Sequence, residues 1–219
     1  NIQKNEYYKN MISQIEDRQI DLSTKIPPKL NAELRTYQKI GYKWLRTLEQ
    51  YKMGGILADD MGLGKTIQLL AVILSYVQKN KGNVKPSIII CPSSLALNWY
   101  NEIQKFTPTL KALVISDDYL ERKRKIEEIG KYQVIITSYD SLKRDIDLYE
   151  NYCFKYVVAD EAQYIKNNNT KNSKAIKTIN AETKFALTGT PIENSLSELW
   201  SIFDLSLIHI SEPTRPLYI

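Results

Sequence analysis

Short β-branched runs alternate with helix-length stretches between Gly54 and Phe203, and no other feature of the chain restricts the fold as strongly. Runs such as III at 88–90 and YVV at 156–158 are continuously apolar, which is typical of strands buried on both faces. Repeated alternation of strand and helix predicts a parallel sheet covered by helices on each side. We therefore predict an α/β fold, a three-layer α/β/α sandwich with a mostly parallel central sheet.

The expected elements follow from the periodicity of each segment. The strand-like segments are GGILA (54–58), SIIIC (87–91), ALVIS (112–116), QVIITSY (133–139), YVVAD (156–160) and KFALTG (184–189). The helix-like segments are 30–48, IQLLAVILSYV (67–77), LALNWYNEIQKF (95–106), ERKRKIEEI (121–129), KAIKTI (174–179) and SLSELWSIF (195–203). In such folds ligands bind at the carboxyl ends of the strands, and most motifs of this chain follow a predicted strand directly.

A glycine-rich loop follows the first predicted strand, in the segment GGILADDMGLGKTIQ at 54–68. Glycines permit a tight loop, and backbone N–H groups at the start of a helix surround an anion. The loop residues expected to hold nucleotide phosphates are Asp60, Met61, Gly62, Leu63, Gly64, Lys65 and Thr66. We predict that Lys65 reaches the β- and γ-phosphates and that the Thr66 hydroxyl holds Mg²⁺.

The loop departs from the strict phosphate-loop pattern, because Asp59 stands where that pattern has its first glycine. Gly62 compensates in part and gives the form A-x-x-x-G-x-G-K-T, which is found in many helicase-like ATPases. The alternative interpretation is a chance glycine-rich turn before a core helix. The strand and the helix on either side favour the phosphate site.

Composition excludes several classes of protein. The apolar runs are shorter than a bilayer requires, and the first ten residues, NIQKNEYYKN, are polar, so we expect no membrane partner. Cys91 and Cys153 lie far apart in apolar surroundings, which indicates two reduced thiols in a reducing compartment. His209 is the only histidine, so histidine-based zinc or triad chemistry is not expected.

The net charge of +5 favours a nucleic-acid partner only weakly. The basic run Glu121-Arg-Lys-Arg-Lys125 suggests DNA contact, but Glu127 and Glu128 follow it at helical spacing. A solvated helix face is the preferred interpretation of this run.

Two carboxylates, Asp160 and Glu161, follow the strand-like run YVVA directly. At the end of a buried strand they lie where the phosphates are expected. We predict that Asp160 holds Mg²⁺ and that Glu161 accepts the proton of the water that attacks the γ-phosphate, so that Lys65, Asp160 and Glu161 are the catalytic residues. The alternative is an acidic turn on a solvated loop.

A second loop, LTGTPIEN at 187–194, ends the next strand-like run. Its hydroxyl groups and its glycine suit a segment that senses the γ-phosphate. We predict that Gln163, Thr188, Gly189 and Thr190 couple hydrolysis to movement. By itself a TGTP sequence is equally common as a turn before a helix.

Upstream, the amide of Gln38 in LRTYQ is able to donate to and accept from adenine. The segments CPSSLALNW and ITSYD also carry hydroxyl side chains at the ends of predicted strands, where helices start. Phosphates of a nucleic-acid backbone could bind at such positions. The predicted nucleic-acid contacts are Ser93, Ser94, Asn98, Trp99, Thr137 and Ser138. The local alternative makes Ser94 a helix cap and Trp99 a core residue.

Together the segments LRTYQ, GGILADDMGLGKTIQ, CPSSLALNW, ITSYD, DEAQ and LTGTPIENSLSELWSIF resemble, in order and separation, the Swi/Snf-type DNA-dependent ATPases of helicase superfamily two. The resemblance covers about residues 30–205, and the leader looks most like bacterial members. It implies a RecA-like first motor lobe, ATP with Mg²⁺, and translocation on double-stranded DNA. It also implies that Gln38 contacts adenine.

The resemblance implies a second RecA-like lobe that supplies arginine fingers, and the 219 residues do not provide one. We expect residues 1–28 to be a leader or the end of an upstream domain, 29–205 to be the ATP-binding lobe, and 206–219 to be a non-native tail. The expected location is the bacterial cytoplasm at the nucleoid, or the nucleus of a eukaryote. RNA polymerase or another DNA-bound protein is a candidate partner.

Two rival functions remain open. A strand-separating helicase shares the fold and the phosphate chemistry, and strand displacement distinguishes it from a translocase. A non-catalytic, nucleotide-gated DNA-binding module is the other, and it would tolerate the loss of Lys65. The complete set Lys65, Thr66, Asp160 and Glu161 argues against lost catalysis.

Overall fold

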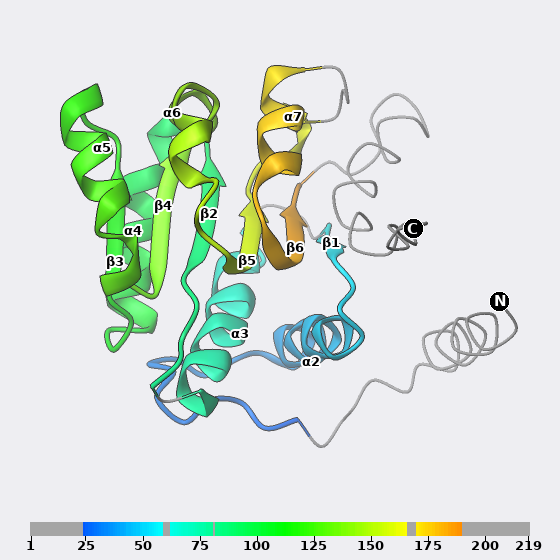
Figure 1. Cartoon of the computed structure of the whole chain (residues 1–219). Coiled ribbons are helices and arrows are strands. Elements are labelled where there is room, and N and C mark those ends of the chain that lie inside the picture. Colours follow the sequence, from blue (N-terminus) through cyan, green and yellow to red (C-terminus); the bar gives the residue numbers. More distant parts are fainter. Residues whose placement is uncertain (1–23, 59–61, 81, 166–169, 190–219) are drawn as a thin grey trace, which may run out of the picture.

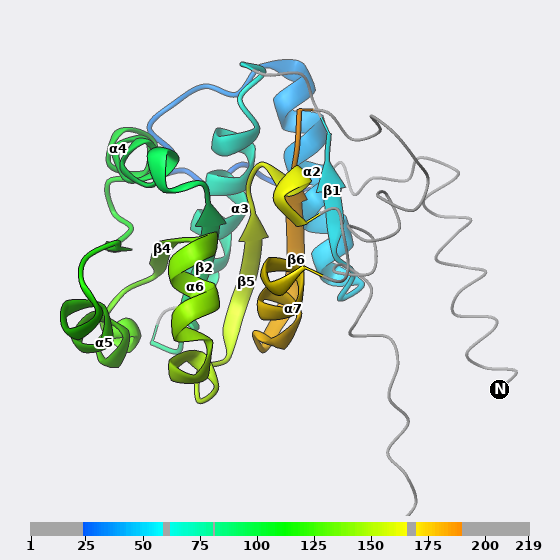
Figure 2. The same cartoon turned by 90° about the horizontal axis from the view of Figure 1, so that it is seen from above.

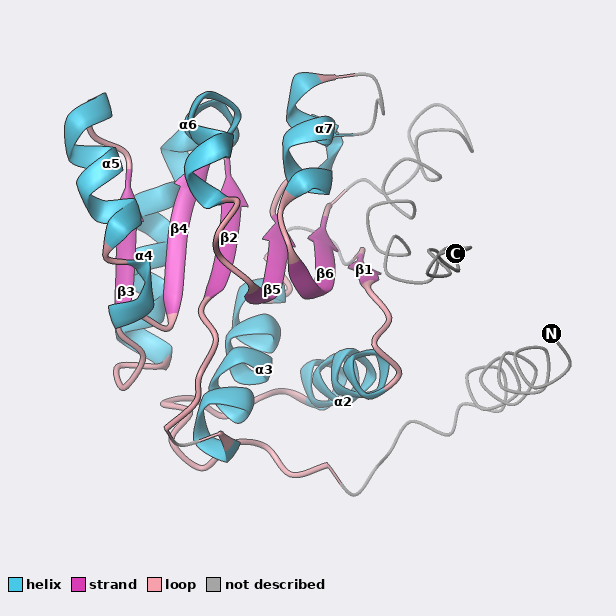
Figure 3. Ribbon diagram, viewed as in Figure 1, coloured by secondary structure: helices cyan, strands magenta, loops and turns pink. Residues whose placement is uncertain are grey.

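The structure is a computed structural model that describes residues 24–58, 62–80, 82–165 and 170–189. Its centre is one six-stranded sheet (Figures 1 and 3). The strands are β1 (Gly55–Leu57), β2 (Ser87–Cys91), β3 (Ala112–Ile115), β4 (Val134–Ser138), β5 (Phe154–Ala159) and β6 (Ala181–Leu187). The helices are α2 (Thr36–Gln50), α3 (Lys65–Lys79), α4 (Ala96–Phe106), α5 (Tyr119–Glu127), α6 (Tyr139–Asp145) and α7 (Lys171–Thr178).

Every strand pair of this sheet is parallel, in the order β1-β6-β5-β2-β4-β3. The register places Leu57 beside Leu187 and Cys91 beside Ser138, so the strands end at one common edge. We call this the carboxyl edge, and the opposite one the amino edge. The predicted α/β fold with a parallel sheet is confirmed.

Helices cover both faces of the sheet, which gives the predicted three layers (Figure 2). Ile89 belongs to the core cluster shared with α2, α3 and α4, whereas its neighbours Ile88 and Ile90 belong to the cluster shared with α5, α6 and α7. Because successive side chains of a strand point to opposite faces, continuously apolar strands are needed when both faces are buried.

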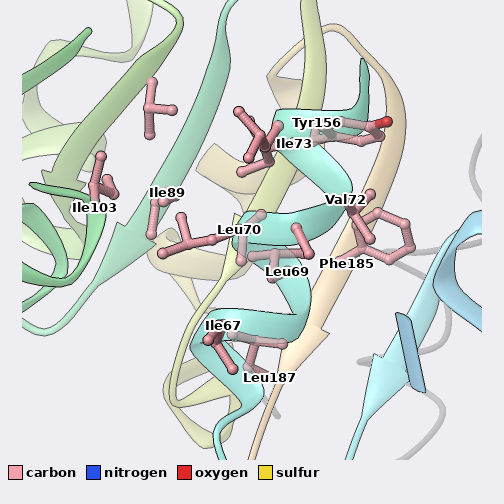
Figure 4. Packing of buried hydrophobic residues seen from close by; sticks show 14 of the residues in the cluster. Ile67, Leu69, Leu70, Val72, Ile73, Ile89, Ile103, Tyr156, Phe185 and Leu187 are labelled. Atoms are coloured by element: carbon pink, nitrogen blue, oxygen red, sulfur yellow. The ribbon is translucent and has the colours of Figure 1, made fainter. Parts of the chain in front are cut away.

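The helix after the glycine-rich loop, α3, forms the centre of one layer. Leu69, Leu70 and Ile73 of this helix have no exposed surface and pack with residues of the neighbouring strands, including Ile89 and Phe185 (Figure 4). Each such side chain stabilises the fold by about 2 kcal/mol through its burial. A helix held this firmly fixes the position of the loop at its N-terminus.

Side-chain caps determine where three other helices begin. Asp118 accepts a hydrogen bond from the Glu121 N–H before α5, and Thr170 accepts one from the Ser173 N–H before α7. Ser138, the last residue of β4, caps α6 in the same way through the Ser141 N–H. One strand residue therefore ends the strand and starts the helix, which keeps the connection short.

The basic run at 121–125 lies on α5, as the preferred interpretation expected, but one of its residues is not solvated. Arg124 pairs with Glu121 on the surface, and Lys125 pairs with Asp117. Arg122 is buried and donates to both carboxylate oxygens of Asp145, at 2.5 and 3.0 Å. A solvated face does not describe Arg122, because its charge is matched inside the protein and fixes α5 against α6.

Both cysteines are free thiols, as predicted, and burial raises the pKa of the Cys91 thiol to about 12. No helix within the described ranges combines the length and apolarity needed to cross a membrane. The predicted leader up to residue 23, the helix at 195–203 and the tail at 206–219 lie outside the described residues. The domain boundaries therefore stay predictions.

Candidate nucleotide site at the carboxyl edge of the sheet

The glycine-rich loop connects the carboxyl end of β1 to the first residue of α3, Lys65. Gly62 and Gly64 have φ angles of +82° and +76°, in the left-handed region that favours glycine. A Cβ atom on Gly64 would lie 2.5 Å from Nε2 of Gln38. The sequence therefore needs glycine at 64 for two reasons, and the N-terminal N–H groups of α3 remain at the site. The predicted loop residues Asp60 and Met61 lie outside the described part.

Gln38 lies against this loop, as the prediction of a nucleotide contact requires. Its Oε1 accepts a hydrogen bond from the Arg35 N–H at 2.9 Å, and its Nε2 donates to the carbonyl of Leu63 at 3.1 Å. The amide thus ties the N-terminus of α2 to the phosphate loop. The predicted contact of Gln38 with adenine stays a prediction.

A cleft of about 570 Å³ opens at this edge. The predicted residues that line it are Gln38, Gly62, Gly64, Lys65, Thr66, Asn98, Asp160 and Glu161. They come from α2, the loop, α3, α4 and the end of β5. Lys65 and Asp160 are 95 positions apart in the sequence. The fold therefore brings the predicted phosphate-binding residues and the carboxylates together in one cleft.

Asp160 is held by the protein at both carboxylate oxygens. Nε1 of Trp99 donates to Oδ2 at 2.7 Å, and the N–H of Glu161 donates to Oδ1 at 2.9 Å. The Tyr139 hydroxyl also donates to the Asp160 carbonyl at 2.7 Å. Burial raises the pKa of the Asp160 carboxyl, while the Trp99 and Glu161 hydrogen bonds and the Lys65 charge oppose that rise.

Glu161 has a φ angle of +51°, a conformation that is uncommon for a residue with a side chain. Its carboxylate accepts a hydrogen bond from Nε2 of Gln163 at 2.6 Å. Backbone strain of this kind costs about 1–3 kcal/mol and occurs mostly at functional sites, where the surrounding structure enforces it. The Glu161 residue lines the cleft in this conformation.

Gln163 connects Glu161 to the loop after β6. The Thr188 hydroxyl donates to Oε1 of Gln163 at 3.4 Å, and the Thr188 N–H donates to the Leu57 carbonyl at 3.2 Å. The predicted coupling residues Gln163 and Thr188 are therefore in contact, and Gly189 is the residue after Thr188. Thr190 lies outside the described residues. The role of this contact in coupling stays a prediction.

The six predicted nucleic-acid contacts fall into two groups. Ser93, Ser94 and Asn98 are exposed on the 3-10 turn Ser93–Leu95 and the start of α4, so they are available to a ligand. Ser138 is engaged as the cap of α6. Its neighbour Thr137 is completely buried and donates to the Ile115 carbonyl at 3.3 Å.

Burial also removes Trp99, which is 2% exposed, from the set of side chains able to touch DNA. For this residue the alternative of a core position describes the structure. The prediction of DNA contact at Trp99 and Thr137 is corrected for the same physical reason, because each side chain points into the protein and uses its polar atom there.

The residues present suit a nucleotide with Mg²⁺. Thr66 and Asp160 offer hydroxyl and carboxylate oxygens, which are the donors that Mg²⁺ prefers. Within the described ranges, no three His, Cys, Asp or Glu side chains gather as a metal site. A protein magnesium site commonly has one or two protein ligands, with phosphates and water completing the shell.

The sequence missed an aromatic pair beside the carboxylates. The rings of Tyr139 and Tyr164 stack at 5.5 Å with an interplanar angle of 12°, and Tyr164 is 52% exposed while Tyr139 is buried. Burial, with the nearby charge of Asp160, raises the pKa of Tyr139 well above its usual range, so this hydroxyl remains a donor. The sequence signal that could have indicated a place for Tyr139 near the site is its position directly after β4.

Comparison with protein families matches residues 37–214 to the SNF2-related domain. An uncharacterised ATP-dependent helicase of Mycoplasma genitalium is 48% identical over 174 residues, which are 80% of this chain and 17% of that protein. Human TATA-binding protein-associated factor 172 is 40% identical over 192 residues, 82% of this chain and 10% of that protein. The chain thus spans less than a fifth of these relatives.

Among solved structures, a SWI2/SNF2 ATPase core from Sulfolobus solfataricus in complex with double-stranded DNA is similar with a TM-score of 0.75. The two are 42% identical, and the similarity covers 82% of this chain and 37% of that one. Fold and sequence therefore agree with the family match. This chain belongs to the SNF2-related domain family.

Proposed function

We propose that this chain is the nucleotide-binding lobe of an ATP-driven motor that moves along double-stranded DNA and remodels protein–DNA complexes. One observation carries the proposal. Lys65 and Thr66 at the start of α3 share a cleft with Asp160 and Glu161 at the end of β5, while Gln163 connects Glu161 to Thr188. The residues proposed to bind phosphate and to activate water meet there, next to a contact between the segments that follow β5 and β6.

Each residue has a distinct role in the proposal. Lys65 binds the β- and γ-phosphates as a point charge, and Thr66 and Asp160 hold Mg²⁺, which neutralises phosphate charge during transfer. Glu161 takes the proton of the attacking water. Gln163 and Thr188 respond to the loss of the γ-phosphate, because their contact begins at the same Glu161 side chain.

Double-stranded DNA is the proposed track. The similar Sulfolobus solfataricus core is described in complex with double-stranded DNA. In this chain Ser93, Ser94 and Asn98 are exposed, and Asn98 lines the cleft. The factors of human and yeast that resemble this chain are named for association with TATA-binding protein. A DNA-bound protein, which for a bacterial chain includes RNA polymerase, is therefore the proposed substrate of remodelling.

A second RecA-like lobe completes the proposed motor. An arginine finger contributes about 10³ to 10⁵ in rate in related phosphoryl-transfer systems, so the 219 residues alone are expected to bind Mg²⁺–ATP and to hydrolyse it very slowly. The test measures ATP binding by the 219-residue chain, and hydrolysis with and without duplex DNA before and after fusion to a second lobe. Absence of ATP binding contradicts the whole proposal, whereas fast DNA-dependent hydrolysis by the chain alone contradicts the need for a second lobe.

A strand-separating helicase is the second candidate, because the similar Mycoplasma genitalium protein is named an ATP-dependent helicase. The two functions differ in their product. We expect the two-lobe protein to displace a triplex-forming strand from duplex DNA without separating the duplex itself. Release of single strands from a duplex would instead favour the helicase.

A further inference from the structure

The indole of Trp99 joins the exposed start of α4 to the carboxylate proposed to bind magnesium. Trp99 has one polar atom, Nε1, which lies 2.7 Å from Oδ2 of Asp160. A buried indole N–H needs a hydrogen-bond partner, but a backbone carbonyl would serve a purely structural role equally well. Here the partner is a side chain that lines the nucleotide cleft.

Two protein donors together restrict the Asp160 carboxylate. The Glu161 N–H occupies a position on Oδ1, and the Trp99 N–H occupies one on Oδ2. A carboxylate bonded at both oxygens cannot turn freely about its last torsion, so the remaining lone pairs keep one direction. The Glu161 bond comes from the adjacent residue, whereas the Trp99 bond comes from another helix and depends on where that helix lies.

The helix that carries Trp99 also reaches the surface. Asn98, the preceding residue, is exposed and lines the cleft, and Ser93 and Ser94 are exposed on the turn before the helix. Leu97 between them is 68% exposed. A bound ligand that displaces this end of α4 must therefore change the Trp99–Asp160 hydrogen bond, because a rigid helix moves as a unit.

We propose that Trp99 is a positioning residue, which orients Asp160 for Mg²⁺ and transmits DNA contact at the start of α4 to the magnesium site. This inference rests on the proposed function and names how that site is regulated. Trp99 touches neither nucleotide nor DNA itself. Its effect is confined to the Mg²⁺-dependent part of nucleotide binding, because Asp160 is the group that it contacts.

The test uses the 219-residue chain and the conservative variant Trp99→Phe, which keeps an aromatic ring at this buried position and removes the N–H donor. ATP affinity is measured with Mg²⁺ and with EDTA. We expect the variant to bind ATP about tenfold more weakly with Mg²⁺ and equally well in EDTA, since a hydrogen bond to a charged group is lost. Trp44→Phe is the matched control, because Trp44 is a partly buried tryptophan of α2 outside the cleft, and it should leave both affinities unchanged.

A spectroscopic readout distinguishes positioning from packing. The chain has three tryptophans, Trp44, Trp99 and Trp200, so a ¹⁵N-labelled sample gives three indole N–H signals, and the Trp99→Phe variant identifies one of them. We expect the Trp99 signal to shift when Mg²⁺–ATP is added and to shift again when a duplex of about two helical turns is added. The Trp44 signal should stay in place.

Several outcomes overturn the inference. Equal Mg²⁺–ATP affinity of Trp99→Phe and the unaltered chain would show that the bond does not position Asp160. Equal losses with Mg²⁺ and in EDTA would assign Trp99 a general packing role. DNA binding, seen by fluorescence anisotropy of the duplex, with no shift of the Trp99 signal would contradict transmission. Failure of the unaltered chain to bind ATP would contradict the proposed function instead, so the two failures are distinguishable.

Discussion

The two edges of the sheet carry similar charged side chains but use them in opposite ways. At the amino edge, Arg46, Glu49, Lys85, Lys155, Glu182 and the Tyr156 hydroxyl form a network that we call the amino-edge network. Each of its three cations pairs with one or both of its two carboxylates. At the carboxyl edge, Asp160 and Glu161 bond mainly to uncharged donors and face an open cleft.

Structural charges differ from functional ones in how completely the protein matches them. Glu49 accepts from Lys155 at 3.0 Å and from the Tyr156 hydroxyl at 2.6 Å, and it also pairs with Arg46. Such a carboxylate has little capacity left for a ligand. Asp160 has no direct ion pair in the interactions described, and its backbone neighbour Glu161 is strained. Unmatched charge and strain, rather than charge alone, mark the site.

Glu49→Gln, which disrupts the amino-edge network, should change the protein more than any other substitution considered below. The substitution leaves the charges of Arg46 and Lys155 without their shared partner, and the side chains of Glu49 and Lys155 are only 9% and 12% exposed. We expect the free energy of unfolding to fall by about 3–5 kcal/mol, as measured by chemical denaturation. Mg²⁺–ATP affinity of the folded protein should not change.

Glu182→Gln is the matched control for this prediction. Glu182 accepts from the same Lys155 at 2.8 Å, but its side chain is 40% exposed. In this variant Lys155 keeps its 3.0 Å pair with Glu49, and Lys85, the other cation bound by Glu182, is 42% exposed and can be solvated by water. We expect a loss of only about 1 kcal/mol. Equal losses for the two variants would contradict the view that burial makes Glu49 the centre of the network.

The next effect concerns the two ends of α3. Lys65→Ala removes the cation at the N-terminus of the helix, which lines the cleft. We expect Mg²⁺–ATP affinity to fall about 100-fold, because a charge-assisted contact to phosphate is lost, and the free energy of unfolding to change little. Isothermal titration calorimetry on the 219-residue chain measures this loss.

Lys79→Ala, at the other end of the same helix, is the control. Lys79 lines a pocket at the amino edge and lies far from the nucleotide cleft. Its removal should leave ATP affinity unaltered. A comparable loss of affinity at both ends would mean that the nucleotide binds through general positive charge and not through the loop.

The sequence predicted the fold and the local parts of the site because both depend on short-range patterns. Continuous apolar strands such as β2 fix a parallel sheet, and a parallel sheet brings the carboxyl ends together. The phosphate loop and the Asp160–Glu161 pair therefore met as expected. Their roles in binding and catalysis remain predictions.

The missed features depend on contacts between distant parts of the chain. Tyr156 bonds to Glu49, 107 positions away, and Trp99 bonds to Asp160, 61 positions away. A periodic pattern shows that Trp99 lies on the apolar face of a helix, but not which polar atom its N–H meets. The sequence likewise does not reveal that Arg122 is buried, because its partner Asp145 belongs to another helix.

The smallest effect tests a buried charge that belongs to neither edge. Lys184, in the middle of β6, is 4% exposed and donates to the carbonyls of Ile176 at 3.1 Å and Lys177 at 3.0 Å, at the end of α7. These carbonyls satisfy the ammonium group only in part, so burial, with a smaller contribution from the Lys177 charge, lowers the pKa of Lys184 from 10.5 to about 8.

A lowered lysine pKa means that the unfolded chain binds more protons than the folded one between about pH 8 and 10.5. Stability contributed by this residue must therefore rise with pH in that window. From pH 8 to 9.5 we expect the unfolding free energy of the unaltered chain to gain about 1.5 kcal/mol relative to Lys184→Met, which has no proton to lose. Lys174→Met, on the exposed side of α7, should show no such trend. If the Lys184→Met difference were independent of pH, the ammonium group would be fully stabilised by the two carbonyls, and Lys184 would resemble the matched charges of the amino-edge network.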